Sequence, residues 1–515
     1  MVRTQCLMEK SNVGSTLESG VIANPRYAKL LDVHRYSEHS GVTALVKPIW
    51  NKCFGTPEEA APRKGGVKPK ASSLSQLRAV LLDLYVAWRQ DPELSVGVAM
   101  NNAAWKTDSR YNKIGMSRLT PKNIRRLHEC GFIDLSPGSY AGPGAATNRN
   151  TRIRAAEPLR KLFREAKFGT PHILTHPGKE SIIMRGGERS ERNLEYEDTD
   201  TTNQMRKELS AYNRLLHRAF VDVPDQEATF IERPIKSGLR AGEAARVPVC
   251  GSDNFVHRVF NRNDWNCGGR FYGGWWQGVG SEFRKRIHIN GQPTVEIDYQ
   301  ALHVAILAAR HGITVSSDPY VLDDGLITGV DAAQQRKLVK LLVLMALNAR
   351  DQNSACSAFR DASPIGSVAK SLKNKELFRV MDAFTEKYPQ LKGDLCADRG
   401  IHLMNTDSKM AAHVLRVFTN LKIPVLCIHD SFIIDYTQAR RLKLVMQAAA
   451  INHIGTQVAL SQNFQGLDEV ETSAPDLVED YLEFRHLPRC HAYEVRERIF
   501  RERVAYLDSL GGGGT

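Results

Sequence analysis

The segment VLCIHDSFIID, residues 425 to 435, places a histidine and an aspartate inside an otherwise apolar run. An apolar run of this length predicts a buried strand or hairpin. An ionised carboxylate that is removed from water needs a cation or a metal ion as its partner. The fold must therefore bring a positive group to Asp430.

A second aspartate has the same setting. In the segment PTVEIDYQALHVAILAARHG, residues 294–297 are typical of a buried strand, Asp298 follows at its end, and residues 302–310 are typical of a helix. Either aspartate alone is most simply a turn or capping residue. If the two strands are neighbours in one sheet, however, the two carboxylates converge and repel each other. A pair of hard divalent cations resolves that repulsion and stabilises the attacking and leaving oxygens of phosphoryl transfer.

Composition limits the classes of protein that remain. The net charge of +13 favours a polyanionic partner, most often nucleic acid. No apolar run approaches the roughly 18 residues of a membrane span, and the first residues lack the apolar stretch of a secretory signal. The nine cysteines are scattered without a Cys-x-x-Cys pair, which argues against a disulfide framework or a zinc ribbon. We therefore expect a cytoplasmic protein with reduced thiols and no membrane partner.

The chain is long enough for several domains, and shifts in polarity indicate where they meet. We expect a loosely packed arm over residues 1–65, a separate domain over 66–170, a polar linker over 171–208 and the main domain over 209–515.

The domain at 66–170 has the pattern of a DNA-binding module. Two helices are followed by a short strand, a Gly/Pro/Asn-rich loop and a second strand, an order that resembles a winged helix-turn-helix. We expect the second helix to enter the major groove with three exposed basic side chains: Lys122, Arg125 and Arg126. The alternative is a small helical domain with a solvated basic face.

Two further segments of the main domain have a composition that suits a nucleotide. Arg336 and Lys340 lie one helical turn apart, at the start of a helix that is apolar on all sides over residues 341–347. Like charges at this spacing repel mildly, so an anion would stabilise the face that carries them. Upstream, residues 264–280 combine aromatic side chains, glycines and Arg270, which suits stacking on bases or sugars. A solvated face and a tightly turned core segment are the respective alternatives.

The order of these motifs resembles the family A DNA polymerases and the single-subunit, phage-type RNA polymerases. Asp298-Tyr299 is similar to motif A, Arg336-x-x-x-Lys340 to the start of motif B, and His429-Asp430-Ser431 to motif C, with Asp435 as a second acidic residue. The resemblance covers roughly residues 260 to 450. It implies an α+β right-hand polymerase of palm, fingers and thumb, with an antiparallel palm sheet.

The resemblance also implies roles for single residues. Asp298 and Asp430 would hold two Mg²⁺ ions, and Lys340 would give a proton to the leaving pyrophosphate. The expected nucleotide-binding residues are Arg336, Lys340, Tyr299, His303 and Asn348. The expected primer and template contacts are His429, Ser431, Arg270 and Asp264.

Several positions depart from the family pattern. His303 stands where family A DNA polymerases have the glutamate that excludes a ribose 2′-hydroxyl. Asn348-Ala349 replaces the Tyr-Gly pair of motif B, and Ser431 follows the RNA polymerase form of motif C. The sequence therefore leaves the choice between dNTP and rNTP open.

Our leading hypothesis is a template-directed nucleotidyltransferase that extends a 3′-hydroxyl, with DNA, a primer and nucleoside triphosphates as partners, in the replication of a phage or mobile element. A single-subunit DNA-directed RNA polymerase or a primase is the closest alternative. A non-catalytic DNA-binding replication initiator is another alternative, and a metal-dependent nuclease ranks last because it would not need the Arg-x-x-x-Lys helix.

Overall fold

The computed structural model describes residues 21–55, 71–142, 145, 147–187, 192–235, 243–249, 251, 254–315, 318–470 and 475–511. Within them the chain forms helices and mainly antiparallel sheets, which is an α+β composition. It divides into two compact units: unit 1 comprises Met1–Thr107 and Ile114–Leu174, and unit 2 comprises Asp108–Lys113 and Thr175–Thr515. No described helix is both long enough and apolar enough to span a membrane.

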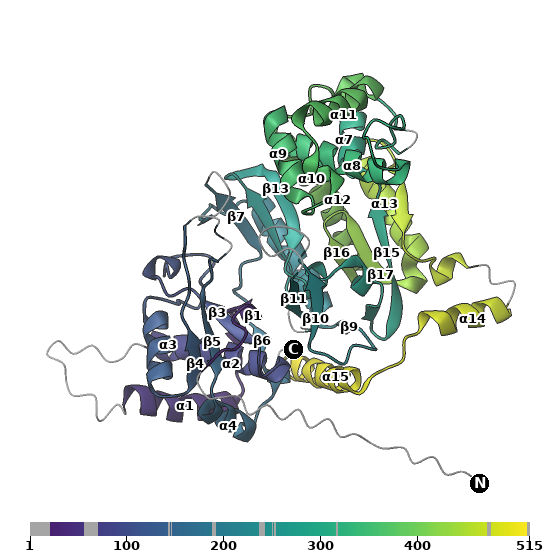
Figure 1. Cartoon of the computed structure of the whole chain (residues 1–515). Helices are drawn as coiled ribbons and strands as arrows, with labels where there is room; N and C mark the ends of the chain where they lie inside the picture. The colour runs from purple at the N-terminus through teal and green to yellow at the C-terminus, as the bar shows by residue number, and fades with distance from the viewer. Residues whose placement is uncertain are drawn as a thin grey trace, which may run out of the picture. The chain divides into compact units, whose positions relative to one another are not determined.

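In its described residues, unit 1 combines four α-helices with a four-stranded sheet of order β1-β3-β5-β4 (Figure 1). The helices are α1 (Ser40–Phe54), α2 (Ala71–Gln90), α3 (Leu119–Glu129) and α4 (Glu157–Glu165). The strands are β1 (Ala28–Leu30), β3 (Ser95–Val98), β4 (Ile133–Ser136) and β5 (Thr151–Ala155). Helix α3 leads through Gly131, whose φ of 76° favours glycine, into the antiparallel hairpin β4–β5.

The segment that we expected to be a loose arm is folded where it is described. Strand β1 pairs with β3 in parallel, and helix α1 buries Val42, Leu45, Val46 and Ile49. This spacing is an amphipathic helical stripe, so the signal was present in the sequence and the surrounding polar residues obscured it. Residues 1–20 and 56–65 of the expected arm lie outside the described residues.

The expected linker over 171–208 also contains regular structure. Strand β7 (Ile182–Gly186) pairs in parallel with β12 (His257–Asn261) and in an antiparallel manner with β8 (Arg192–Leu194). The side chains of Ile182 and Met184, two residues apart on the strand, are both buried in the core of unit 2. Their burial stabilises the strand although the residues around it in the sequence are polar. These strands continue the hairpin of β12 and β13 (Asp264–Tyr272) into a four-stranded sheet of order β13-β12-β7-β8.

The central sheet of unit 2 positions the aspartates. Its six strands have the order β16-β17-β15-β14-β9, with β18 also paired to β15. Their bounds are β9 (Val221–Asp222), β14 (His288–Ile289), β15 (Gln292–Tyr299), β16 (Val425–Ile428), β17 (Ser431–Asp435) and β18 (Leu460–Gln462). Helices α12 (Gly400–Asn420) and α13 (Ala439–Ile454) pack beside this sheet (Figure 1).

The other helices of unit 2 follow the expected pattern where the sequence was strongly periodic. Helix α7 (Leu302–Arg310) follows β15, and α8 (Ala332–Asn348) begins at Asp331, whose side chain accepts a hydrogen bond from Gln334 N. Further bounds are β6 (Leu174–Thr175), α5 (Asp200–His217), β10 (Phe230–Pro234), β11 (Ala244–Pro248), α6 (Ser281–Arg284), α9 (Gln352–Ala362), α10 (Val368–Ser371), α11 (Asn374–Lys387), α14 (Pro475–Arg485) and α15 (His491–Gly511).

Candidate active site

Asp298 and Asp430 lie at the same end of two neighbouring strands. Strands β15 and β17 are antiparallel, with Asp298 opposite Ser431, and Asp430 precedes Ser431 in the two-residue turn between β16 and β17. The amide of Tyr299 donates to the carbonyl oxygen of Asp430 at 3.4 Å. His429, the first residue of the turn, takes a φ of 58°, which is uncommon for a residue other than glycine.

The charges of the two aspartates interact. Burial raises the pKa of Asp298 to about 7, and the negative charges of Asp430 and Glu296 act in the same direction. Lys340 and Arg284 oppose this rise in the pKa. The ionised site is therefore electrostatically unfavourable until further positive charge arrives.

Glu296 is a third carboxylate that the sequence interpretation missed. It precedes Asp298 by two residues on β15 and so points to the same face of the sheet. Arg284 donates from Nε and Nη2 to the two oxygens of Glu296 at 3.0 and 2.8 Å, and Ser431 Oγ donates to Oε1 at 2.9 Å. This bidentate pair neutralises Glu296 and leaves Asp298 and Asp430 as the carboxylates without such a partner among the described residues.

Arg270 is anchored by a residue to which we had assigned no role. Arg270 donates from Nε to both oxygens of Asp407 on α12, at 3.2 and 3.1 Å, and His303 Nε2 lies 3.0 Å from Asp407 Oδ2. Burial acts to lower the pKa of Arg270, but the hydrogen bond and charge of Asp407 outweigh it and raise that pKa. Asp430 also contributes to the rise, which places Arg270 within electrostatic range of the turn.

His303 and His429 are the two imidazoles of the site. The Nδ1 atoms of both are buried without a hydrogen-bond partner among the described residues. Burial lowers the pKa of His429, and the positive charge of Arg270 lowers it further. The His429 ring lies edge-on to Tyr272, with ring centroids 5.3 Å apart. Each imidazole therefore has a buried nitrogen whose hydrogen-bonding capacity is not satisfied by the described residues.

Arg336 and Lys340, the two expected triphosphate ligands on α8, have different surroundings. Lys340 is exposed, and its charge lowers the pKa of Asp298, so it lies near the carboxylates. Arg336 forms an ion pair with Asp318, which lies between α7 and α8. Tyr320 is buried in the same segment, and its raised pKa, caused first by burial, responds to Asp318, Arg336 and Asp430.

Three other expected site residues are engaged within the protein. Tyr299 is buried, and its hydroxyl donates to Met446 O at 2.5 Å. Asn348 donates from Nδ2 to Leu344 O at 2.7 Å. Asp264 accepts from the amide of Asn266 at 2.8 Å, which is the first of the causes that lower its pKa. The contact of Tyr299 is with α13, and those of Asn348 and Asp264 are with neighbouring residues in the chain; none of these three contacts is with Asp298 or Asp430.

The basic residues of α3 belong to unit 1. Lys122, Arg125 and Arg126 are all exposed, while Ile124 and Leu127 on the opposite side of the helix are fully buried. Arg126 also donates to Glu129 Oε2 at 3.0 Å, so part of its charge is already compensated. Lys122 and Arg125 are the stronger candidates for an anionic ligand.

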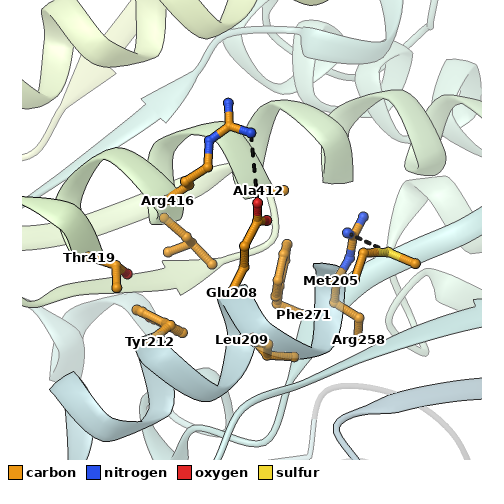
Figure 2. A pocket seen from close by; sticks show the side chains of 10 residues that line it. Met205, Glu208, Leu209, Tyr212, Arg258, Phe271, Ala412, Arg416 and Thr419 are labelled. Carbon is orange, nitrogen blue, oxygen red and sulfur yellow. Dashed lines mark hydrogen bonds and ion pairs between the residues drawn. The ribbon is translucent and has the colours of Figure 1, made fainter. Parts of the chain in front are cut away.

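A separate pocket lies between α5 and α12 in unit 2 (Figure 2). It is small, with a cavity volume of about 20 Å³, and its lining is mainly apolar, with Tyr212, Phe271 and Leu415. Neither Asp298 nor Asp430 lines it.

Arg258 lines one end of this pocket and connects elements that carry the site (Figure 2). It donates from Nε to Gly269 O at 2.9 Å and from Nη2 to Ser408 Oγ at 3.2 Å. Burial lowers the pKa of Arg258 to about 10. Gly269 and Ser408 are the chain neighbours of Arg270 and Asp407. We therefore infer that Arg258 stabilises the two segments that carry the Arg270–Asp407 ion pair.

The side chains at the site determine which metal ion it could hold. Within the described ranges, no group of three or more His, Cys, Asp and Glu side chains is arranged to hold an ion. The donors that converge are two carboxylates, Asp298 and Asp430. Two hard oxygen donors of this kind suit Mg²⁺, which usually keeps several waters and takes one or two carboxylates along with substrate phosphates.

Comparison with known proteins gives little further information. No protein-family model matches the chain, and no curated protein matches it. A solved structure of the POL domain of Pol1 from M. smegmatis, in complex with DNA primer-template and dNTP, is similar at a TM-score of 0.28 and 10% identity, over 76% of this chain and 69% of that one. A similarity at this level does not establish a shared fold or function.

Proposed function

We propose that this protein is a template-directed nucleotidyltransferase that adds nucleotides to a 3′-hydroxyl. The observation that carries the proposal is the pair of aspartates, 298 and 430, which face an uncompensated repulsion beside the exposed cation of Lys340. A site that needs additional positive charge next to a basic helix suits a metal-bound triphosphate.

Asp298 and Asp430 would hold Mg²⁺ in this proposal. The ions, when bound, supply positive charge to the phosphoryl group in transfer and to the attacking and leaving oxygens. The chain's own residues bind and orient the substrate. Arg336 and Lys340 bind the triphosphate oxygens, and Lys340 Nζ gives a proton to the departing pyrophosphate. The turn between the paired strands β16 and β17 would hold Asp430 beside the end of β15.

The nucleic acid would be held by both units. In unit 2, Arg270 and His429 contact the primer and template beside the carboxylates, and Asp407 holds the guanidinium of Arg270 in position. In unit 1, α3 and the β4–β5 hairpin act as a winged helix-turn-helix, with the exposed side chains of Lys122 and Arg125 directed to DNA phosphates or bases. Residues 66–170 then recruit the polymerase domain, 209–515, to a DNA site.

The identity of the nucleotide sugar, deoxyribose or ribose, is a separate question. His303 stands at the position where family A DNA polymerases have a glutamate. Its imidazole contacts Asp407 and Arg270. This arrangement leaves a single-subunit RNA polymerase or a primase as the alternative function.

An extension assay tests the proposal. The purified protein is given Mg²⁺ and either a primed or an unprimed DNA template, with dNTPs and rNTPs in separate reactions, alongside Asp430→Asn and the control Asp324→Asn. We expect extension by the native protein and the control and none by Asp430→Asn, with the accepted nucleotide identifying the branch. No product under any condition, with DNA binding intact, would leave a non-catalytic DNA-binding initiator as the better account.

A further inference from the structure

The ion pair between Arg336 and Asp318 is the feature of unit 2 that the proposed function leaves unexplained. Arg336 is the residue expected to bind a triphosphate, yet its guanidinium already donates to the Asp318 carboxylate. The side chains of Arg336 and Asp318 are 40% and 31% exposed, so solvent and a ligand both reach the pair.

Asp318 is held firmly by its own backbone. Its Oδ1 accepts a hydrogen bond from Tyr320 N at 2.9 Å, which leaves Oδ2 for Arg336. Tyr320 is 2% exposed and anchors the segment in the core. This bond orients the carboxylate of Asp318, so its second oxygen faces Arg336.

The segment that follows Asp318 is also connected to the helices around it. Gln335 on α8 accepts from Ile327 N at 3.0 Å and donates to Asp323 O at 2.8 Å. Lys387 on α11 donates to Val321 O at 2.8 Å. These bonds connect the segment after Asp318 to α8, the helix that carries Arg336, and to α11.

We propose that Asp318 is an internal competitor for the triphosphate on Arg336. This inference rests on the proposed function. A carboxylate and a phosphate oxygen bind a guanidinium in the same way, so the triphosphate must displace Asp318 or bind beside a negative charge. In either case Asp318 weakens ground-state binding of the nucleotide.

The expected size of the effect follows from exposure. Half-exposed ion pairs contribute little, and the cost of displacing one corresponds to about a two- to fivefold change in affinity. Asp318→Asn is a suitable variant because the amide oxygen of asparagine still accepts the hydrogen bond from Tyr320 N. Asp324→Asn is the matched control: it removes the same charge from the same segment, and Asp324 is exposed and has no ion pair with any described residue.

The test is isothermal titration of each protein with inorganic tripolyphosphate and with dNTP, in buffer containing Mg²⁺. We expect about two- to fivefold tighter binding by Asp318→Asn, unchanged binding by Asp324→Asn, and no effect of Asp318→Asn in an Arg336→Met background. In extension assays Asp318→Asn should lower the KM for nucleotide by the same factor without changing kcat.

The outcomes separate this inference from the proposal on which it rests. Binding by Asp318→Asn that is unchanged or weaker than in the native protein would overturn the inference alone, because Asp318 would then be neutral or would position Arg336 for the ligand. Absence of tripolyphosphate and dNTP binding in every protein would overturn the proposed function and the inference together.

Discussion

Replacing Asp298 with asparagine is expected to stabilise the metal-free protein at alkaline pH. Asp298 is a partly buried carboxyl beside the charge of Asp430, and its pKa in the folded protein is about 7, against an ordinary value of 3.8. A raised carboxyl pKa means that the folded state binds more protons than the unfolded state between these two values. The free energy of unfolding therefore falls as the pH rises from about 4 to about 7, and it stays low above that.

The size of this loss follows from the pKa change. A change from 3.8 to about 7 corresponds to about 4 kcal/mol at pH 8, since one pKa unit is about 1.4 kcal/mol. Asparagine removes the charge but keeps a polar group that is partly desolvated, so we expect a net gain of about 1–3 kcal/mol at pH 8 and almost none at pH 5.

The assay is urea denaturation in EDTA at both pH values, followed by the same experiment in Mg²⁺. Asp298→Asn should be the more stable protein at pH 8 in EDTA, while Mg²⁺ should stabilise only the native protein. Asp324→Asn, which removes an exposed charge, should change neither result. If Asp298→Asn were less stable than the native protein at pH 8 in EDTA, the carboxylate would be compensated within the protein and our electrostatic interpretation of the site would be wrong.

Three other substitutions test single contacts. Asp407→Asn leaves the guanidinium of Arg270 without its carboxylate, and urea denaturation should show a loss of about 2–4 kcal/mol together with reduced primer extension. In Gly400→Ala the new Cβ would lie 2.0 Å from Asn348 Oδ1, which should cost about 1–3 kcal/mol, and the double variant with Asn348→Ala should recover most of it. Lys122→Ala should weaken DNA binding about equally for all sequences and reduce the salt slope by about one, measured by fluorescence anisotropy, without changing the urea midpoint.

The sequence predicts local structure well where hydrophobic periodicity is strong. The helix expected at residues 302–310 coincides with α7, and the strand at 294–297 lies within β15. The sequence indicated that Asp298 and Asp430 converge if their strands are neighbours, and the register, which pairs residues 298 and 431, shows that the strands are neighbours. The helices and strands within the arm and the linker were missed because the polar residues around them dominate the pattern.

The contacts that position the site were less accessible from the sequence. Asp407 and Arg270 are far apart in the chain, and only the packing of α12 against β13 brings them together. No sequence motif surrounds Asp318. Its position beside Arg336 depends on the path of the chain between α7 and α8. Glu296 did carry a signal, since it lies two residues before Asp298 on the same face of a strand, and that spacing could have been used.

The central claim is that Asp298 and Asp430 act as one catalytic unit. Single-turnover primer extension in Mg²⁺ by Asp298→Asn, Asp430→Asn and the double variant tests it most directly, with Asp324→Asn as the control for loss of charge. We expect each single variant to lose at least about a thousandfold in rate, and the double variant to be no slower, because residues that act as a unit are not additive. A rate within tenfold of the native protein in either single variant, with DNA binding and the urea midpoint unchanged, would contradict the claim.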